Sequence, residues 1–435
     1  MERFALSRMK EWKENENRKP LIIRGARQVG KTWIMKTFGQ QYFEKTAYVN
    51  FDNNARMKQV FEGDLDIERL VLAISAETGV SIEAENTLII FDEIQEVPKA
   101  LTSLKYFHEN APQYAIVAAG SLLGVALHQG TSFPVGKVDF LDLYPLNFRE
   151  FLCAMGEKQF VSMLDSCDTQ MVTVFKTKYI ERLREYYFVG GMPEVVKDFS
   201  EKKDYNRVRV IQKNLINYYQ QDFSKHAEIK LVPRLNLVWN SIPMQLAKEN
   251  KKYIYGQVRE GSRAKDFELA IQWLLDCGLI HKVQRIQKPD LPLKAYIDFD
   301  AFKLFLVDIG LLIAMTDLDA KVIIEGNKIF TEFNGSLTEQ YILQQLISDV
   351  GVIPYYYSTQ NSKGEIDFLV QGKTSVIPIE VKAEENLKAK SLKAFCEKYQ
   401  PSYAVRTSML DYREQDWMTN IPLYAIKWIE NYVNQ

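Results

Sequence analysis

The sequence has few of the features that mark secreted or zinc-binding chains. Its 435 residues include only four cysteines, which form no C-x-x-C pair, and four histidines, which are isolated from one another. This scarcity argues against a disulfide framework and against a zinc site, and it is typical of a reducing compartment. We therefore expect a cytoplasmic protein.

Long apolar runs and an excess of one charge are also missing. No apolar stretch approaches the ~20 residues of a membrane-spanning helix, so we expect no membrane partner. Residues 1–19 are polar and charged, unlike a signal peptide. The formal net charge is -1, so no global basic field favours nucleic acid. Any contact with DNA must come from a local patch.

The chain does contain a phosphate-binding motif. Residues 25–32 read G-x-x-x-x-G-K-T between an apolar run, Leu21–Ile23, and a helical pattern that begins at Lys31. Glycines let backbone N–H groups point at phosphate oxygens, and a helix N-terminus adds partial positive charge. Lys31 can reach the β- and γ-phosphates, and the Thr32 hydroxyl can ligate Mg²⁺. The alternative, a glycine turn beside a surface lysine, is disfavoured by the flanking strand and helix. The predicted ATP-binding residues are Gly25, Ala26, Arg27, Gln28, Val29, Gly30, Lys31, Thr32 and Trp33.

Two carboxylates follow a second apolar strand. Leu88–Phe91 predicts a central strand, and Asp92 and Glu93 emerge at its carboxyl end, where open α/β sheets bind ligands. Asp92 can hold Mg²⁺ through water, and Glu93 can activate the attacking water. The alternative is an ordinary acidic turn. After the strand at Tyr114–Ala119, Ser121 is a candidate contact to the γ-phosphate, although it could equally cap the next helix.

Strands and helices alternate over the first 150 residues, which predicts a parallel sheet covered on both faces. The expected strands are Leu21–Arg24, Ala47–Phe51, Leu88–Phe91, Tyr114–Ala119 and Lys137–Leu141. From Pro145 to about Lys225 the pattern is helical, which suggests a lid.

A helical pair followed by two short strands comes next. The helices are expected at Leu231–Glu249 and Arg263–Cys277, and the strands at Leu279–Val283 and Leu293–Ile297. This order suggests a winged-helix fold, which often binds DNA. The exposed helix face mixes basic and acidic side chains, so a packing or protein-contact role is about equally favoured.

The C-terminal segment carries a second group of charged residues. Strand alternation places Glu380 and Lys382 on one face, and a short turn brings Asp367 to the neighbouring strand. Carboxylates beside a lysine suit a divalent metal and a water nucleophile. Glu339 lies on an otherwise apolar helix stripe, where a carboxylate is costly unless it is paired or metal-bound, so it is a candidate third ligand. The alternative is a hairpin with exposed charges.

With these motifs the chain resembles a prokaryotic family that joins an AAA-type ATPase domain to a C-terminal domain of unknown function, itself similar to the PD-(D/E)XK nuclease superfamily. The resemblance covers essentially the whole chain. Residues 25–32 match the Walker A loop, 88–93 the Walker B strand, and Gly120 with Ser121 the sensor position. Segments 145–151 and 190–194 match landmarks at the lid. The nuclease motif is matched by Asp367, Glu380 and Lys382, with Glu339 at its helical acidic position.

One position departs from the family pattern. Many relatives are expected to have an arginine after a glycine where this chain has Gly136 and Lys137. An arginine finger spreads over the transferred phosphoryl group with a rigid fork, and a lysine does so less well. Arg149 or Arg182 of a neighbouring subunit is an alternative source of this charge, which makes a second copy of the chain a candidate partner.

We therefore expect a multidomain α/β protein. Residues 1–144 form a P-loop ATPase core, 145–228 a helical lid, 229–300 a winged-helix-like module and 301–435 a nuclease-like domain. ATP and Mg²⁺ are the expected cofactors, and DNA is a candidate partner. The predicted function is an ATPase that switches a DNA-processing domain. The alternatives are an ATP-dependent scaffold that holds nucleic acid without cutting it, and an interaction protein with a structural nucleotide.

Overall fold

The computed structural model describes residues 1–120, 133–248, 251–324, 331–359, 364–383 and 389–435. Their contacts divide the chain into two compact units. The N-terminal unit comprises Glu2–Tyr144 with Gln272–Leu279, and the C-terminal unit comprises Met1, Pro145–Ile271 and Ile280–Gln435. Within the described ranges, no helix is both long enough and apolar enough to cross a bilayer.

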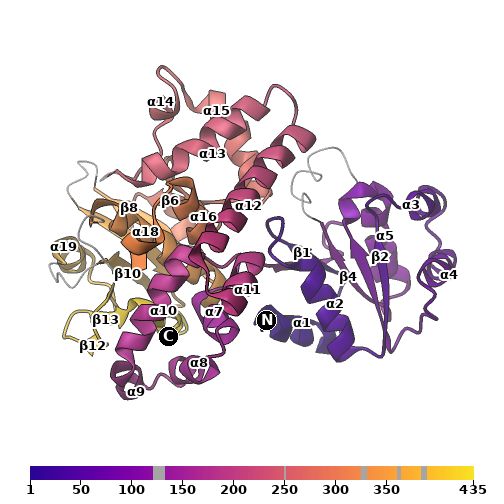
Figure 1. Ribbon diagram of the computed structural model, residues 1–435, viewed down its shortest axis with the longest axis horizontal. Helices are drawn as coiled ribbons and strands as arrows, with labels where there is room; N and C mark the ends of the chain where they lie inside the picture. The colour runs from indigo at the N-terminus through magenta and orange to yellow at the C-terminus, as the bar shows by residue number, and fades with distance from the viewer. Residues whose placement is uncertain (121–132, 249–250, 325–330, 360–363, 384–388) are drawn as a thin grey trace. The chain divides into compact units, whose positions relative to one another are not determined.

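The N-terminal unit is built on a five-stranded sheet in the order β2-β3-β4-β1-β5 (Figure 1). Every strand pair in it is parallel, as the sequence predicts for this part of the chain. The strands are β1 (Leu21–Arg24), β2 (Lys45–Asn50), β3 (Thr87–Asp92), β4 (Ala115–Ala119) and β5 (Asp139–Asp142). The α-helices of this unit are α1 (Ala5–Glu14), α2 (Lys31–Tyr42), α3 (Ala55–Glu62), α4 (Ile67–Thr78) and α5 (Pro98–Asn110).

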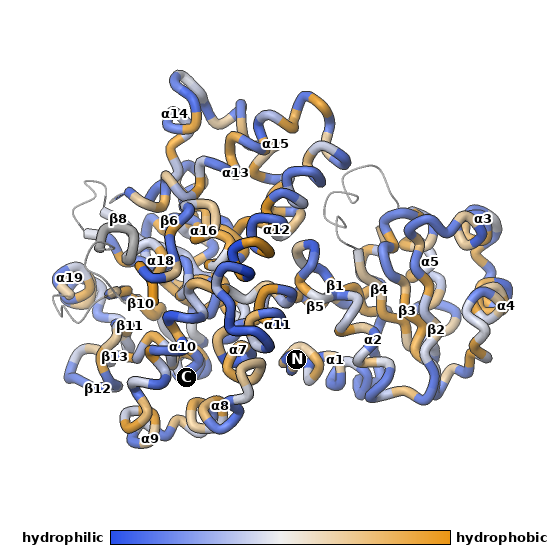
Figure 2. The backbone as a smooth tube through the Cα atoms, in the orientation of Figure 1, coloured by the Kyte–Doolittle hydropathy of each residue, from blue (hydrophilic) through white to orange (hydrophobic). Residues whose placement is uncertain are grey.

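Strand β3 is an interior strand of this sheet, between β2 and β4, and it is apolar on both faces. All six of its residues are buried. Ile89 and Phe91 pack in one core cluster with Phe61 of α3 and Leu104 of α5. Figure 2 shows the apolar character of β3 and β4 along their length. Asp92 is the last residue of this buried strand and lies at its carboxyl end, where open α/β sheets bind ligands.

The C-terminal unit contains most of the helices. They are α7 (Phe148–Ala154), α8 (Lys158–Asp165), α9 (Thr169–Val174), α10 (Lys176–Val189), α11 (Pro193–Lys202), α12 (Tyr205–His226), α13 (Val232–Leu246), α14 (Tyr255–Val258), α15 (Ala264–Asp276), α16 (Ile309–Met315), α17 (Ala320–Ile324), α18 (Thr331–Gln345), α19 (Lys390–Tyr399) and α20 (Glu430–Val433). Helix α15 ends within the N-terminal unit. Helix α18 continues as a π-helical turn, η4 (Leu346–Val350).

A mixed eight-stranded sheet forms the centre of this unit, in the order β12-β13-β11-β10-β9-β8-β6-β7. Its strands are β6 (Ile280–Ile286), β7 (Ile297–Leu306), β8 (Tyr355–Ser358), β9 (Glu365–Gln371), β10 (Val376–Val381), β11 (Val405–Ser408), β12 (Arg413–Glu414) and β13 (Thr419–Pro422). The 3-10 helices in the part of the chain that the structure describes are η1 (Ile94–Glu96), η2 (Leu293–Tyr296) and η5 (Leu423–Ile429).

The two strands expected for a wing belong to this large sheet. Strand β6 pairs antiparallel with β7, and it also pairs parallel with β8. The boundary expected after residue 300 therefore falls inside β7, and the division of the chain into four parts stays a prediction. The expected strand Leu293–Ile297 is wrong for most of its length because Leu293–Tyr296 forms η2. There the backbone N–H of Leu293 donates to the Gln371 side chain at 3.0 Å, and this tertiary contact is not visible in the local sequence.

Candidate functional site

The phosphate-loop motif, residues 25–32, joins the carboxyl end of β1 to the first turn of α2. Gly25 has φ +142°, and a Cβ atom there would lie 2.1 Å from the carbonyl oxygen of Leu143. Gly30, with φ +94°, is the last residue before α2 and has a left-handed backbone conformation, and the helix starts at Lys31. Both positions require glycine, and together they give the loop its curvature.

Lys31 is buried at the start of α2. Its Nζ donates to the carbonyl oxygens of Gly25 and Ala26, each at 2.9 Å. Burial lowers the pKa of Lys31 to about 8, although the negative charges of Glu93 and Asp92 oppose that shift. The ammonium group thus lies inside the loop, where the motif predicts a contact to the β- and γ-phosphates.

Asp92 contacts Thr32 at the carboxyl end of the parallel sheet. The Thr32 hydroxyl donates to the Asp92 carboxylate at 2.7 Å, and the Tyr48 hydroxyl donates to the same oxygen at 2.9 Å. Only β4 separates the strand that carries Asp92 from β1, so the two carboxyl ends are neighbours. A hydroxyl beside a carboxylate fits Mg²⁺, which is bound through one or two protein oxygens together with phosphate and water. Tyr48 was not predicted, because its role depends on the pairing of β2 with β3.

Glu93 follows Asp92 in a left-handed backbone conformation, with φ 51°. Its backbone N–H donates to the Asp92 side chain at 3.1 Å. The Gln95 side chain donates to the Glu93 carboxylate at 2.7 Å. Glu93 is therefore held at the carboxyl end of β3, where a base for the attacking water is expected. Gln95 is a further residue of this site that motif spacing does not reveal.

The remaining predictions for this site are not tested by its geometry. Ser121 lies outside the described residues, and Trp33 is exposed on α2. Lys137 forms an ion pair with Glu109 at 3.0 Å. The assignment of Lys137 as a substitute for an arginine finger therefore stays a prediction.

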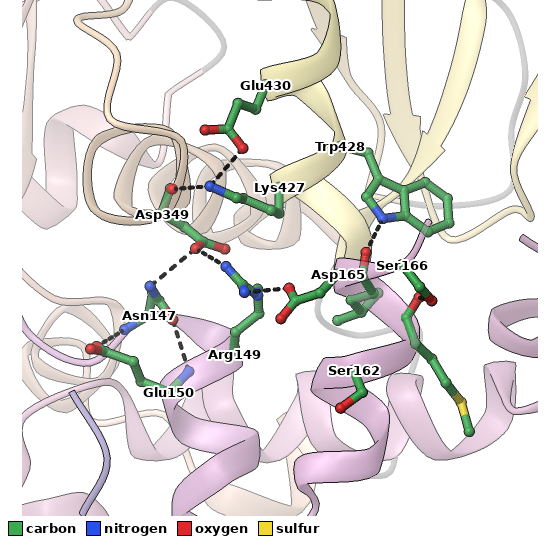
Figure 3. A network of polar contacts seen from close by, with 12 residues as sticks. Asn147, Arg149, Glu150, Ser162, Asp165, Ser166, Asp349, Lys427, Trp428 and Glu430 are labelled. Carbon is green, nitrogen blue, oxygen red and sulfur yellow. Dashed lines mark hydrogen bonds and ion pairs between the residues drawn. The ribbon is translucent and has the colours of Figure 1, made fainter. Parts of the chain in front are cut away.

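Both alternative arginines are engaged within the C-terminal unit. Arg182 forms a bidentate pair with Glu157, the shortest contact being 2.7 Å. Arg149 pairs with Asp349 at 2.8 Å and also with Asp165 (Figure 3). Either side chain would have to leave its carboxylate partners before it could reach a phosphate.

Figure 3 shows that Arg149 belongs to a polar network joining α7, α8, η4 and η5. The Asn147 side chain donates to Asp349 at 3.3 Å. Lys427 donates to the backbone carbonyl of Asp349 at 3.1 Å, and the Trp428 indole donates to the carbonyl of Leu164 at 2.7 Å. These bonds between protein groups hold the four elements together.

Two of the residues predicted for the nuclease motif, the buried Glu339 and the partly buried Asp367, belong to a group of charged side chains in the C-terminal unit. Burial and the negative charge of Glu339 raise the pKa of Asp367 to about 7. Lys251 and Lys303, which were not predicted, supply the cations of this cluster. Asp367 also accepts a hydrogen bond from the backbone N–H of Val381 at 2.7 Å, which ties β9 to β10.

The other two residues of the motif pair with each other. Glu380 is buried, and its carboxylate lies 2.6 Å from the Lys382 ammonium. The second oxygen of the Glu380 carboxylate accepts from the backbone N–H of Leu392 at 3.3 Å. Asp367 contacts the same stretch of β10, because its carboxylate accepts from the backbone N–H of Val381, the residue between Glu380 and Lys382.

A divalent metal does not fit the predicted set in this arrangement. In the parts of the chain that the structure describes, no group of three or more His, Cys, Asp or Glu side chains could hold a metal ion. Each of the three predicted carboxylates already faces an ammonium or a backbone N–H, as just described. The roles of Glu339, Asp367, Glu380 and Lys382 in a nuclease site stay predictions.

Three family models match successive parts of the chain. Residues 17–152 match a family described as an AAA domain. Residues 180–322 and 334–426 match domains of unknown function, DUF8612 and DUF4143. No curated protein matches the chain.

Solved structures are similar to this chain only at low sequence identity and low TM-score. The Walker-type ATPase paby2304 of Pyrococcus abyssi is 15% identical with a TM-score of 0.44, and the match covers 72% of this chain and 95% of that one. The Orc1 protein of Aeropyrum pernix, solved in complex with DNA, is 14% identical with a TM-score of 0.27, covering 72% and 91%. Cdc6p from Pyrobaculum aerophilum is 10% identical with a TM-score of 0.25, covering 74% and 93%.

The match to an AAA domain spans the phosphate loop and the strand that ends in Asp92. Together with the parallel sheet, this match supports an AAA-type P-loop ATPase and nucleotide binding, so the sequence prediction is confirmed at that level. These matches do not test the nuclease-like and winged-helix assignments, which stay predictions.

Proposed function

We propose that this protein binds ATP with Mg²⁺ at the phosphate loop and hydrolyses it. The observation that carries the proposal is the hydrogen bond of 2.7 Å between Thr32 and Asp92, beside the buried ammonium of Lys31. A hydroxyl, a carboxylate and an ammonium in one small volume are the groups that a metal-bound triphosphate needs.

Each side chain then has a separate task. The Lys31 ammonium leaves the carbonyl oxygens of the loop and neutralises the β- and γ-phosphates. Thr32 and Asp92 would hold Mg²⁺, which would supply positive charge to the phosphoryl oxygens. Glu93, fixed by Gln95, orients the attacking water and accepts its proton. The loop N–H groups and the N-terminus of α2 stabilise the remaining negative charge.

The first experiment separates ATP binding from hydrolysis. Glu93→Gln keeps the size of the side chain but removes the charge that activates water. We expect it to bind ATP with affinity close to that of the wild type and to turn over at least about 100-fold more slowly. Glu96→Gln, three residues away and exposed, is the matched control. Wild-type turnover in Glu93→Gln would remove Glu93 from the proposed mechanism.

We also propose that the nucleotide state controls the C-terminal unit. The sequence suggests a DNA-processing role for that unit, with DNA and a second copy of the chain as partners in the cytoplasm. The ion pairs around Glu339 and Glu380 favour the alternative, a scaffold that binds nucleic acid or protein without cutting it. A structural nucleotide without turnover is the third possibility.

A cleavage assay distinguishes these roles. Single-stranded, duplex and branched DNA are incubated with the full chain in Mg²⁺ or Mn²⁺, with and without ATP. For a scaffold we expect no nicking, and any DNA binding should appear as stimulated ATPase activity. Nicking by the wild type that is absent from Asp367→Ala would support the cutting role, while slow, unstimulated turnover would favour a structural nucleotide.

A further inference from the structure

The side chain of Lys303 on β7 is completely buried within the C-terminal sheet unit. Its ammonium lies 2.5 Å from the Glu365 carboxylate on β9 and 3.5 Å from the Glu339 carboxylate on α18. It also lies 4.9 Å from the centre of the Tyr356 ring on β8. Burial alone would lower the pKa of Lys303, but the negative charges of Glu339, Glu365 and Asp367 outweigh it and raise the pKa above its usual range.

A second lysine completes the cluster from another direction. Lys251, which precedes α14, forms an ion pair with the other oxygen of Glu339. Glu339 thus has one ammonium on each carboxylate oxygen. These two positive charges lower the pKa of Glu339, against the opposing effect of its burial. The carboxylate that the sequence places on an apolar helix stripe is therefore neutralised by lysines from β7 and from the segment before α14.

A divalent cation cannot bind to these carboxylates while the Lys303 ammonium is in place. Mg²⁺ needs carboxylate oxygens that point into one open space, together with room for water. Here the inward oxygens of Glu339 and Glu365 are already bound to a buried ammonium. Placing Mg²⁺ beside Lys303 would set two cations against each other in a medium of low dielectric constant, and displacing Lys303 would leave a buried charge without its partners.

We propose that Lys303 is the permanent cation of the cluster formed by Glu339, Glu365 and Asp367, and that the C-terminal unit therefore holds no divalent metal there and does not cleave nucleic acid through these carboxylates. The role of Lys303 is to fix β7, β9 and α18 together, as a structural ion pair does. This inference concerns the C-terminal unit alone and does not depend on ATP hydrolysis.

The test is a titration of the full-length chain with Mn²⁺ in the absence of nucleotide, followed by electron paramagnetic resonance. All chains carry Asp92→Asn, so that the phosphate loop contributes no metal signal. We expect Asp367→Asn and Glu339→Gln to leave the Mn²⁺ signal of the parent unchanged, because these carboxylates bind no metal. A site in the parent that either substitution abolishes would overturn the proposal.

Removing the ammonium should create the missing site. Lys303→Gln frees the carboxylates, so we expect Mn²⁺ to bind about tenfold or more tightly than in the parent. Lys303→Arg keeps the charge and should stay metal-free, and Lys393→Gln, an exposed lysine on α19, controls for the loss of any positive charge. A folded Lys303→Gln chain with no added Mn²⁺ affinity would contradict the proposal. If that variant does not fold, the parent titration alone decides.

Because the titration contains no ATP, its outcome is independent of the proposed hydrolysis. ATP turnover is measured separately in chains with the native Asp92. Loss of turnover with the expected Mn²⁺ result would refute only the ATPase proposal, and the reverse pattern would refute only the inference on Lys303.

Discussion

Asp308 shows how a buried charge acts at the scale of a single residue. It caps helix α16 by accepting a hydrogen bond from the Leu311 N–H at 3.1 Å, and it accepts another from Gly191 at 2.6 Å. Burial nevertheless raises the pKa of this carboxyl from 3.8 to about 6. The hydrogen bonds are thus too few to make the charged form as favourable as it is in water.

This shift predicts a pH dependence of stability. Because the folded pKa of Asp308 exceeds the unfolded value, its contribution is complete below pH 3.8 and is lost as the pH rises through about 6. We expect the free energy of unfolding of the wild type, compared with Asp308→Asn, to fall by about 3 kcal/mol over that window. Urea denaturation at several pH values measures the difference. The exposed Asp319→Asn should show no such trend, and a constant difference for Asp308→Asn would contradict the prediction.

At the scale of elements, two glycines explain the turn between α10 and α11. A Cβ atom on Gly190 would lie 2.2 Å from the Asp308 carboxylate, and one on Gly191 would lie 2.1 Å from the carbonyl oxygen of Leu146. The sequence predicts a sharp turn at this point. The structure adds that α16 and the segment before α7 approach the turn too closely for any side chain.

Helix α7 begins with a capping box that also reaches a neighbouring element. The Asn147 side chain accepts from the Glu150 N–H at 2.8 Å, and the Glu150 side chain accepts from the Asn147 N–H at 3.2 Å. The same Asn147 side chain donates to Asp349 of η4. Asn147 therefore provides a hydrogen-bond acceptor for a backbone N–H in the first turn of α7, and it also links that turn to η4.

We expect Asn147→Ala to lower the free energy of unfolding by about 2 kcal/mol, because it removes both the cap and the bond to Asp349. Asp168→Ala is the matched control. Asp168 caps α9 by accepting from Met171 at 3.0 Å, but it is exposed. The Asp168→Ala substitution should therefore lower the free energy of unfolding by about 1 kcal/mol or less. Equal losses in the two variants, measured by urea denaturation, would show that the bond to η4 adds nothing.

At the scale of the whole molecule, the proposed switch requires that ATP act on both units. A ligand can shift a second unit only by the difference in its affinity for that unit's two states. Hydrogen exchange of Glu93→Gln with and without ATP measures this effect. We expect slower exchange in the phosphate loop and α2, and a change in the C-terminal unit as well. Changes confined to Glu2–Tyr144 and Gln272–Leu279 would contradict the switch and leave a simple nucleotide-binding unit.

The sequence by itself determined the nucleotide-binding loop, because the physics of that loop is local. Glycines at 25 and 30, the lysine and the start of α2 lie within eight consecutive residues, and each acts through its own backbone or its nearest neighbours. The strand before Asp92 is equally clear from its continuous apolar run. The parallel sheet follows from the alternation of such runs with helices.

Only the tertiary structure decided the partners of the buried charges. Glu339 and Lys303 are 36 positions apart, and Glu339 and Lys251 are 88 apart, so no local pattern joins them. The expected wing likewise became part of the larger sheet through a tertiary contact, because β6 pairs with both β7 and β8. The sequence predicts that Glu339 needs a positive partner. That this partner is an ammonium was decided by the tertiary fold, which brings Lys303 of β7 and Lys251 before α14 to the carboxylate on α18.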